Sequence, residues 1–237
     1  MIKKKICPIC KGTGFVIEVV NGVEYAKLCK CRLSDRFLTK NEKANIPPRF
    51  IGAELEWYKP EDGNESQIRA KERIKRFIND FPAVTKGLLL MGPTGVGKTR
   101  LLSSIATELF KKTPQLDVFY VDWNDLVREM KSGEDYSTRD YDGINQMIMR
   151  LIDVDLLLFD ELGGSSVSAW VYDNIYYLLN KRYNNNKITV CATNYFDSTD
   201  VLKTTLSDRI GVRLRSRLYE MTEIIEIYGN DYRKKNG

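Results

Sequence analysis

The sequence predicts an α/β protein whose parallel β-sheet carries a nucleotide-binding loop, together with a small metal-binding β-hairpin at the N-terminus. Three observations lead to this prediction. An apolar run opens into a glycine-rich loop and then a helix, two further apolar runs end in acidic or amide residues, and four of the five cysteines lie within residues 7–31. The 237 residues are enough for one well-buried domain and a small appendage.

Composition narrows the class of protein. Hydrophobic residues make up 43% and charged residues 29% of the chain, as in a folded globular protein. No run of about 18 apolar residues is present to cross a membrane, and residues 1–10 contain no apolar core of a secretory signal. We therefore expect a cytoplasmic protein with reduced thiols and no membrane partner. The chain has no histidine, which excludes a histidine base and metal binding by imidazole.

Positive charge is concentrated in the first part of the chain. Residues 1–50 contain eleven Lys+Arg and four Asp+Glu, a net charge of +7, whereas the remaining residues carry a net charge of −2. Such a segment favours contact with nucleic acid or another anionic surface. A solvated basic face is the alternative.

Four cysteines have the spacing of a metal site, C-x2-C-x18-C-x-C: Cys7, Cys10, Cys29 and Cys31. Between them, the β-prone runs Phe15–Val20 and Val23–Leu28 flank an Asn-Gly turn, which is typical of a hairpin. Pairing outward from the turn places Gly14 opposite Cys29. The four thiolates then converge, as a structural tetrahedral Zn2+ site requires. Disulfides or four unrelated thiols are the alternatives.

The chain divides into three predicted segments. Residues 1–45 form the zinc-binding hairpin module, residues 46–66 a linker and residues 67–237 the α/β domain. The consecutive prolines Pro47 and Pro48 bar a helix in the linker. An amphipathic helix opens the domain, and Pro82 ends it.

The most specific motif is G-x-x-x-x-G-K-T at residues 92–99, between the apolar strand Gly87–Met91 and an apolar helix. In this context, backbone N–H groups and the helix N-terminus surround phosphate groups. We expect Lys98 to reach the β- and γ-phosphates of ATP and the Thr99 hydroxyl to bind Mg2+. A glycine-rich loop of another kind is the alternative. The residues assigned to nucleotide binding here are Gly92, Pro93, Thr94, Gly95, Val96, Gly97, Lys98, Thr99 and Arg100.

A second apolar run, residues 156–159, ends in Asp160 and Glu161. Parallel α/β sheets bind ligands at the carboxyl ends of their strands. Asp160 is placed to hold Mg2+, and Glu161 to orient and deprotonate the attacking water. Strands often end in acidic residues, so the assignment depends on the phosphate-binding loop upstream.

A third apolar run, Ile188–Thr193, leads to Asn194. P-loop ATPases of the RecA or AAA+ kind place a polar sensor residue at the end of such a strand, between the two nucleotide motifs. Asn194 is the candidate catalytic sensor and Thr193 the second choice, with a strand-terminal turn as the alternative. Cys191, within this run, is interpreted as a small core residue.

Residues 207–221 predict a helix with one apolar and one basic stripe, capped by Ser207. The apolar stripe consists of Leu206, Ile210, Leu214 and Leu218, and the basic stripe of Arg209, Arg213 and Arg217. The arginine row suits a finger that acts in trans on a neighbour's γ-phosphate, or contacts with a phosphate backbone. A solvated basic face is the alternative.

In this order, the motifs resemble the bacterial and phage helicase-loader family of DnaC and DnaI, with the related IstB transposition ATPases. The resemblance spans about residues 46–233 and includes, besides the motifs above, Ile46-Pro47-Pro48-Arg49-Phe50, Asn180-Lys181-Arg182-Tyr183, Ser216-Arg217-Leu218 and Gly229-Asn230-Asp231-Tyr232-Arg233.

The resemblance implies a P-loop AAA+ core with sheet order 5-1-4-3-2 over residues 88–91, 116–121, 156–159, 188–193 and 224–228. It implies an arginine finger at Arg217 and a nucleotide-sensing arginine at Arg233. It also places a loader-specific insertion near single-stranded DNA at residues 131–143. No separate lid domain is expected, so that a neighbouring subunit closes the nucleotide site.

The function implied is an ATP-dependent loader that places a replicative, hexameric DnaB-type helicase on single-stranded DNA in DNA replication. Its cofactors are ATP, Mg2+ and structural Zn2+, and it self-assembles with nucleotide. Its ATPase activity is expected to be weak alone and stimulated by assembly or DNA. The alternative is an IstB-like ATPase that regulates a transposase on duplex DNA. A small-molecule kinase is disfavoured because Glu161 is suited to activating water and the arginines cluster late in the chain.

Overall fold

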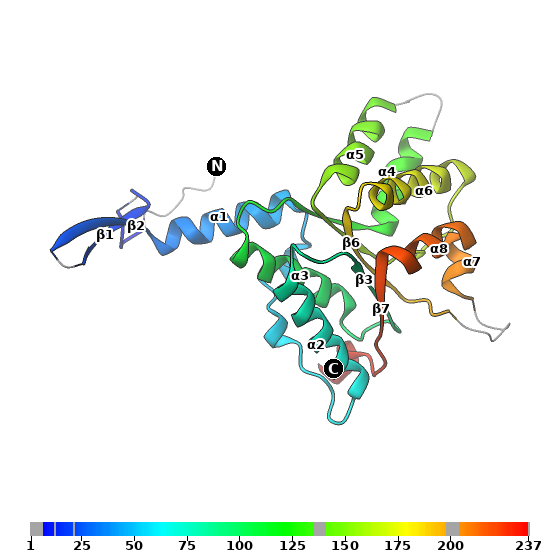
Figure 1. Cartoon of the computed structure of the whole chain (residues 1–237), viewed down its shortest axis with the longest axis horizontal. Helices are drawn as coiled ribbons and strands as arrows, with labels where there is room; N and C mark the ends of the chain where they lie inside the picture. The colour runs from blue at the N-terminus through cyan, green and yellow to red at the C-terminus, as the bar shows by residue number, and fades with distance from the viewer. Residues whose placement is uncertain (1–6, 12, 21, 135–140, 198–203, 237) are drawn as a thin grey trace. The chain divides into compact units, whose positions relative to one another are not determined.

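The computed structural model describes residues 7–11, 13–20, 22–134, 141–197 and 204–236 (Figure 1). The chain divides into two compact units, Met1–Lys43 and Ala44–Gly237. In the part of the chain described, no helix is long and apolar enough to span a membrane.

The first unit is the predicted hairpin followed by a helix. Strands β1 (Phe15–Val20) and β2 (Val23–Leu28) pair antiparallel, and helix α1 (Lys30–Lys43) follows. The register confirms the prediction, because the N–H of Cys29 donates to the carbonyl of Gly14 at 2.9 Å. Ile17 and Val19 remain 69% and 62% exposed. The hairpin therefore gains little stability from apolar burial of its own.

The second unit contains, within the described residues, a five-stranded parallel sheet of order β4-β5-β6-β3-β7. The strands are β3 (Gly87–Met91), β4 (Val118–Asp122), β5 (Leu156–Asp160), β6 (Ile188–Thr193) and β7 (Thr222–Glu226). Numbered from the strand before the glycine-rich loop, this is the predicted order 5-1-4-3-2. Strand β4 begins two residues later than predicted, at Val118, and strand β7 begins two residues earlier than predicted, at Thr222.

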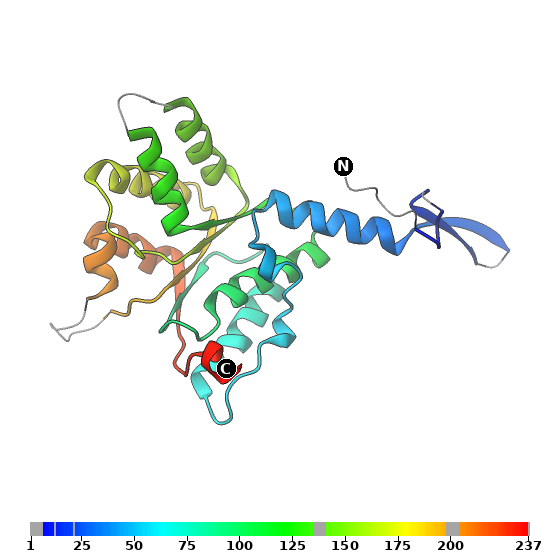
Figure 2. The ribbon, with the colours of Figure 1, turned by 180° about the vertical axis from the view of Figure 1, so that it is seen from behind.

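Helices cover both faces of this sheet (Figures 1 and 2). Helices α2 (Glu65–Asp80) and α3 (Lys98–Lys112) lie on one face. The opposite face carries α4 (Trp123–Glu134), α5 (Tyr141–Asp153), α6 (Ala169–Asn184) and α8 (Val212–Met221). The sheet is thus buried on both sides, which explains why β3 and β5 are continuous apolar runs.

Residues 46–66, expected as a linker, lie within the second unit instead. Ile46, Leu55 and Tyr58 are buried at 3–4% exposure. Two short 3-10 helices, Pro48–Phe50 and Leu55–Trp57, shape the segment. The segment belongs to the second unit because its apolar side chains are buried against the domain that contains the sheet.

The predicted arginine-bearing helix is broken into two. Helix α7 (Leu206–Ile210) ends at Gly211, whose φ of 75° lies outside the helical region, and α8 follows. The cap is Thr205, not Ser207: its hydroxyl accepts from the N–H of Asp208, and the Asp208 carboxylate accepts from the N–H of Thr205. The predicted apolar stripe is nevertheless confirmed, with all four members fully buried. The arginine row therefore spans two helices.

Candidate functional site

The glycine-rich loop lies between β3 and α3, and at Gly92, Gly95 and Gly97 it leaves no room for a side chain. Gly95 and Gly97 have φ values of 91° and 94°, which disfavour any other residue. A Cβ on Gly95 would lie 2.0 Å from Oδ1 of Asp231, and one on Gly92 would lie 2.3 Å from the carbonyl oxygen of Ile227. The segment after β7 thus packs directly against the loop.

Lys98 crosses the loop and reaches the neighbouring strand. Its ammonium group donates to the carbonyls of Gly92 and Pro93, at 2.7 and 2.9 Å, and to Oδ1 of Asn194 at 2.7 Å. Lys98 is 6% exposed. Burial lowers its pKa to about 8, although the carboxylate of Glu161 opposes this shift. A phosphate oxyanion is the ligand that such a buried, partly desolvated ammonium favours.

Asn194 joins Lys98 to Glu161. The Asn194 Nδ2 donates to Oε2 of Glu161 at 2.7 Å, so the three side chains form one hydrogen-bonded chain. Burial and the adjacent Asp160 carboxylate raise the pKa of Glu161. The φ of Glu161 is 53°, a strained value for this residue type that is typical of functional positions.

Asp160 is held from two sides. Its carboxylate accepts from the Tyr120 hydroxyl at 2.8 Å and from the N–H of Glu161 at 2.9 Å. Asp160 is 2% exposed. Carboxylate and hydroxyl oxygens are donors that suit Mg2+, so the chemistry of Asp160 and Thr99 fits the predicted ion.

A cavity of about 560 Å3 lies beside the glycine-rich loop, and Lys98, Glu161 and Asn194 are part of its wall. It is lined by Arg49, Phe50, Trp57, Tyr58, Lys59, Thr94, Gly95, Gly97, Lys98, Thr99, Arg100, Glu161, Asn194, Tyr232 and Arg233. Five basic side chains and one acidic side chain suit a triphosphate, and four aromatic rings suit a base. The residues present therefore fit ATP.

The aromatic part of this cavity was missed by the sequence analysis. Trp57, Tyr58 and Tyr232 come from segments outside the nucleotide motifs, and the Tyr58 hydroxyl donates to the carbonyl of Val96 at 3.2 Å. The available signal was the presence of several aromatic residues in a predicted linker, because a solvated linker has no need for them.

The predicted arginines separate in the structure. Arg233 lines the cavity. Arg217 lies with its guanidinium 4.7 Å from the centre of the Tyr183 ring on α6, Arg213 is exposed, and Arg209 contacts the loop after β5. Of the insertion expected at residues 131–143, residues 135–140 lie outside the described part of the chain. Cys191 is fully buried, as predicted, and burial raises its pKa to about 12.

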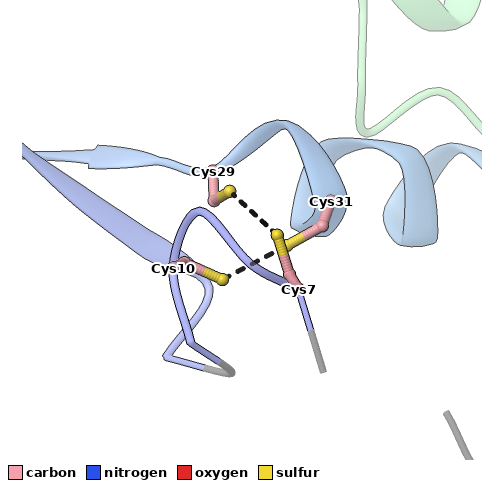
Figure 3. Close-up of side chains that lie close together, drawn as sticks. All are labelled: Cys7, Cys10, Cys29 and Cys31. Atoms are coloured by element: carbon pink, nitrogen blue, oxygen red, sulfur yellow. Dashed lines mark hydrogen bonds between the residues drawn. The ribbon is translucent and has the colours of Figure 1, made fainter. Parts of the chain in front are cut away.

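The four N-terminal cysteines converge (Figure 3). The sulfurs of Cys10 and Cys31 are 3.4 Å apart, those of Cys7 and Cys29 are 3.9 Å apart, and all four lie within 4.8 Å of one another. Zn–S bonds of about 2.3 Å in tetrahedral geometry place sulfurs about 3.8 Å apart. The cluster thus fits zinc, and no disulfide joins its four cysteines.

Tyr120→Phe tests the hydroxyl contact to Asp160. We expect the variant to need about tenfold more Mg2+ for half-maximal ATP hydrolysis, because a group that orients a metal-binding carboxylate tunes its affinity by such factors. Mg2+ titrations of hydrolysis and of nucleotide-analogue fluorescence measure this directly. An unchanged Mg2+ requirement would show that the hydroxyl serves only to satisfy a buried carboxylate.

Comparisons with known proteins agree with this geometry. A family model described as "IstB-like ATP binding protein" matches residues 36–237. The replicative helicase loader DnaI of Bacillus subtilis (strain 168) is 30% identical over 166 residues, which cover 66% of this chain and 50% of DnaI. The chain therefore spans about half the length of that relative.

Solved structures give the same result. A crystal structure of the DnaC helicase loader matches with a TM-score of 0.64 and 31% identity, covering 76% of this chain and 99% of that chain. A crystal structure of DnaI matches with a TM-score of 0.60 and 29% identity, covering 77% and 94%. AMPPCP-bound DnaA from Aquifex aeolicus, at 24% identity and a TM-score of 0.60 over 81% of this chain and 54% of that chain, shares the fold.

Proposed function

The chain belongs to the IstB-like ATP-binding protein family, and from this premise we propose that it is an ATP-dependent loader of a replicative, hexameric DnaB-type helicase onto single-stranded DNA. The observation that carries the proposal is the similarity to the DnaC helicase loader, which covers 99% of that chain at 31% identity. It favours a loader over a transposase regulator.

The cavity supports ATP hydrolysis as the energy source. Lys98 and Arg233 bring positive charge to the phosphates, and Glu161 orients and deprotonates water, while Asn194 holds Glu161 in place. Thr99 and Asp160 would hold Mg2+, which would supply positive charge next to the phosphates. The cysteine cluster holds a structural Zn2+.

Assembly and DNA binding are the remaining parts of the proposal. Arg217 lies on α8, outside its own cavity, as a finger that serves a neighbouring subunit would. Assembly with nucleotide then completes each site. The N-terminal excess of positive charge supports binding to the phosphates of single-stranded DNA.

The test is co-purification of the tagged protein with the replicative helicase of the same host, with ATP, with a non-hydrolysable analogue and without nucleotide. We expect a complex that forms with nucleotide, delivers helicase to single-stranded circular DNA, and is lost in Lys98→Ala. DNA binding should weaken steeply with salt. Absence of any helicase complex, together with a strong preference for duplex DNA, would contradict the proposal and favour a transposition role.

A further inference from the structure

Arg209 differs from the other members of the arginine row because its contacts reach the two segments that carry Glu161 and Asn194. We propose that Arg209 is a positioning residue that fixes the segments carrying Glu161 and Asn194, rather than a finger for a neighbour. This inference rests on the proposed ATPase function of the same cavity.

Arg209 touches both catalytic segments. Its Nε donates to the carbonyl of Gly163 at 2.7 Å, two residues after Glu161. Its guanidinium also lies 5.2 Å from the centre of the Tyr195 ring, and Tyr195 directly follows Asn194. One side chain therefore joins the end of β5 to the end of β6 next to the hydrogen-bonded Asn194–Glu161 pair.

Hydrogen bonds hold every carbonyl of the turn after β5, residues 161–163. Each of its three carbonyls accepts a hydrogen bond from a different group. The carbonyl of Glu161 accepts from the N–H of Gly164 at 2.7 Å, and that of Leu162 accepts from Oγ1 of Thr193 at 2.8 Å. The carbonyl of Gly163 accepts from Nε of Arg209 at 2.7 Å. Two of these donors belong to the turn and the adjoining strand. Arg209 supplies the third from a separate helix.

Gly163 packs closely against Arg209, so the turn and helix α7 are in direct contact. A Cβ on Gly163 would lie 2.9 Å from the Cβ of Arg209, and the φ of Gly163 is 80°. Helix α7, which carries Arg209, is itself anchored, since Leu206 and Ile210 are fully buried. The main chain of Arg209 is therefore fixed against the turn, and its half-buried side chain is not a free surface cation.

The strained Glu161 needs such support. A residue with φ of 53° returns to a relaxed conformation unless its neighbours hold it. A planar guanidinium can donate a hydrogen bond and stack on a ring at once, which an ammonium group cannot. Arg209 thus links α7, and through Gly211 the helix that carries Arg217, to the position of the catalytic carboxylate.

Hydrogen exchange of the segment 161–165 in nucleotide-free protein tests the contact without requiring activity. In Arg209→Gln we expect this segment to exchange about tenfold faster, since one hydrogen bond is worth roughly a factor of ten, with little change in Tm. Arg209→Lys should lie between wild type and Arg209→Gln. Arg128→Gln, an exposed arginine on α4, is the matched control and should leave exchange unchanged. Wild-type protection in Arg209→Gln would overturn the inference, whatever the protein loads.

Kinetics provide the second test. Arg209→Gln should bind a fluorescent ATP analogue within about threefold of wild type, whereas kcat falls about tenfold to a hundredfold, because small displacements of a catalytic group cost factors of this size. Mixing it with Glu161→Gln, with co-assembly verified by a tagged subunit, should give no recovery, since every site then lacks one of the two residues. Recovery would show that Arg209 acts in trans and would overturn the inference.

Discussion

Glu161→Gln is expected to bind ATP and to lose its hydrolysis, with kcat reduced by about a hundredfold to ten-thousandfold, the range for loss of a general base. The amide cannot take a proton from water. It can still accept from Nδ2 of Asn194 through its oxygen, so the geometry of the site is retained. The carboxylate of Asp160, which we propose as an Mg2+ ligand, and its contact with Tyr120 are untouched.

Phosphate release under single-turnover conditions and binding of a fluorescent ATP analogue measure the two effects separately. Lys98→Ala is the contrasting variant: it removes the ammonium that bridges the loop and Asn194, and should lose nucleotide binding itself. If Glu161→Gln hydrolysed ATP at the wild-type rate, Glu161 would not be the general base.

The pH dependence of kcat provides an independent test of Glu161 as the general base. The pKa of Glu161 is raised by burial and by Asp160, so its carboxylate is protonated at a higher pH than an exposed glutamate. A base must be deprotonated to act. As the pH decreases, kcat of the wild-type protein should therefore begin to fall at a pH above the usual pKa range of a glutamate. The residual kcat of Glu161→Gln should not show this decrease.

The nucleotide motifs could be predicted because they are local. Residues 92–99 and the pair Asp160 and Glu161 each occupy one loop or one strand end, and parallel strands bring their carboxyl ends together. The hairpin was predictable for the same reason, since its turn fixes the register and thereby the cysteine cluster.

The rest of the site depends on contacts between distant segments. Tyr58 and Tyr232 meet with ring centres 6.2 Å apart across more than 170 positions, which no local pattern encodes. Arg182, fully buried on α6, donates to carbonyls at the end of α5, although its sequence context is that of a polar surface helix. The break at Gly211 was missed because the apolar spacing of four continues across it, and the glycine itself was the signal.

Removal of zinc is expected to unfold the hairpin module and leave the ATPase unit folded. Metal binding supplies folding free energy on the order of 10–16 kcal/mol in small zinc domains. The apolar side chains of the hairpin, such as Ile17 and Val19, stay mostly exposed and cannot replace that contribution. The two units are separately compact, so the cavity around Lys98 should keep its nucleotide affinity.

Metal analysis should give about one zinc per chain, as a four-thiolate site requires. Cys10→Ser should lose the zinc and become open to proteolysis before residue 44, whereas Cys191→Ala removes a buried thiol outside the cluster and should retain it. The sulfur separations of 3.4 and 3.9 Å are close to the spacing in a tetrahedral four-thiolate site and longer than a disulfide bond. A metal-free protein whose first 43 residues resist protease as well as the zinc-loaded form would show that the cysteines converge for a reason other than metal binding.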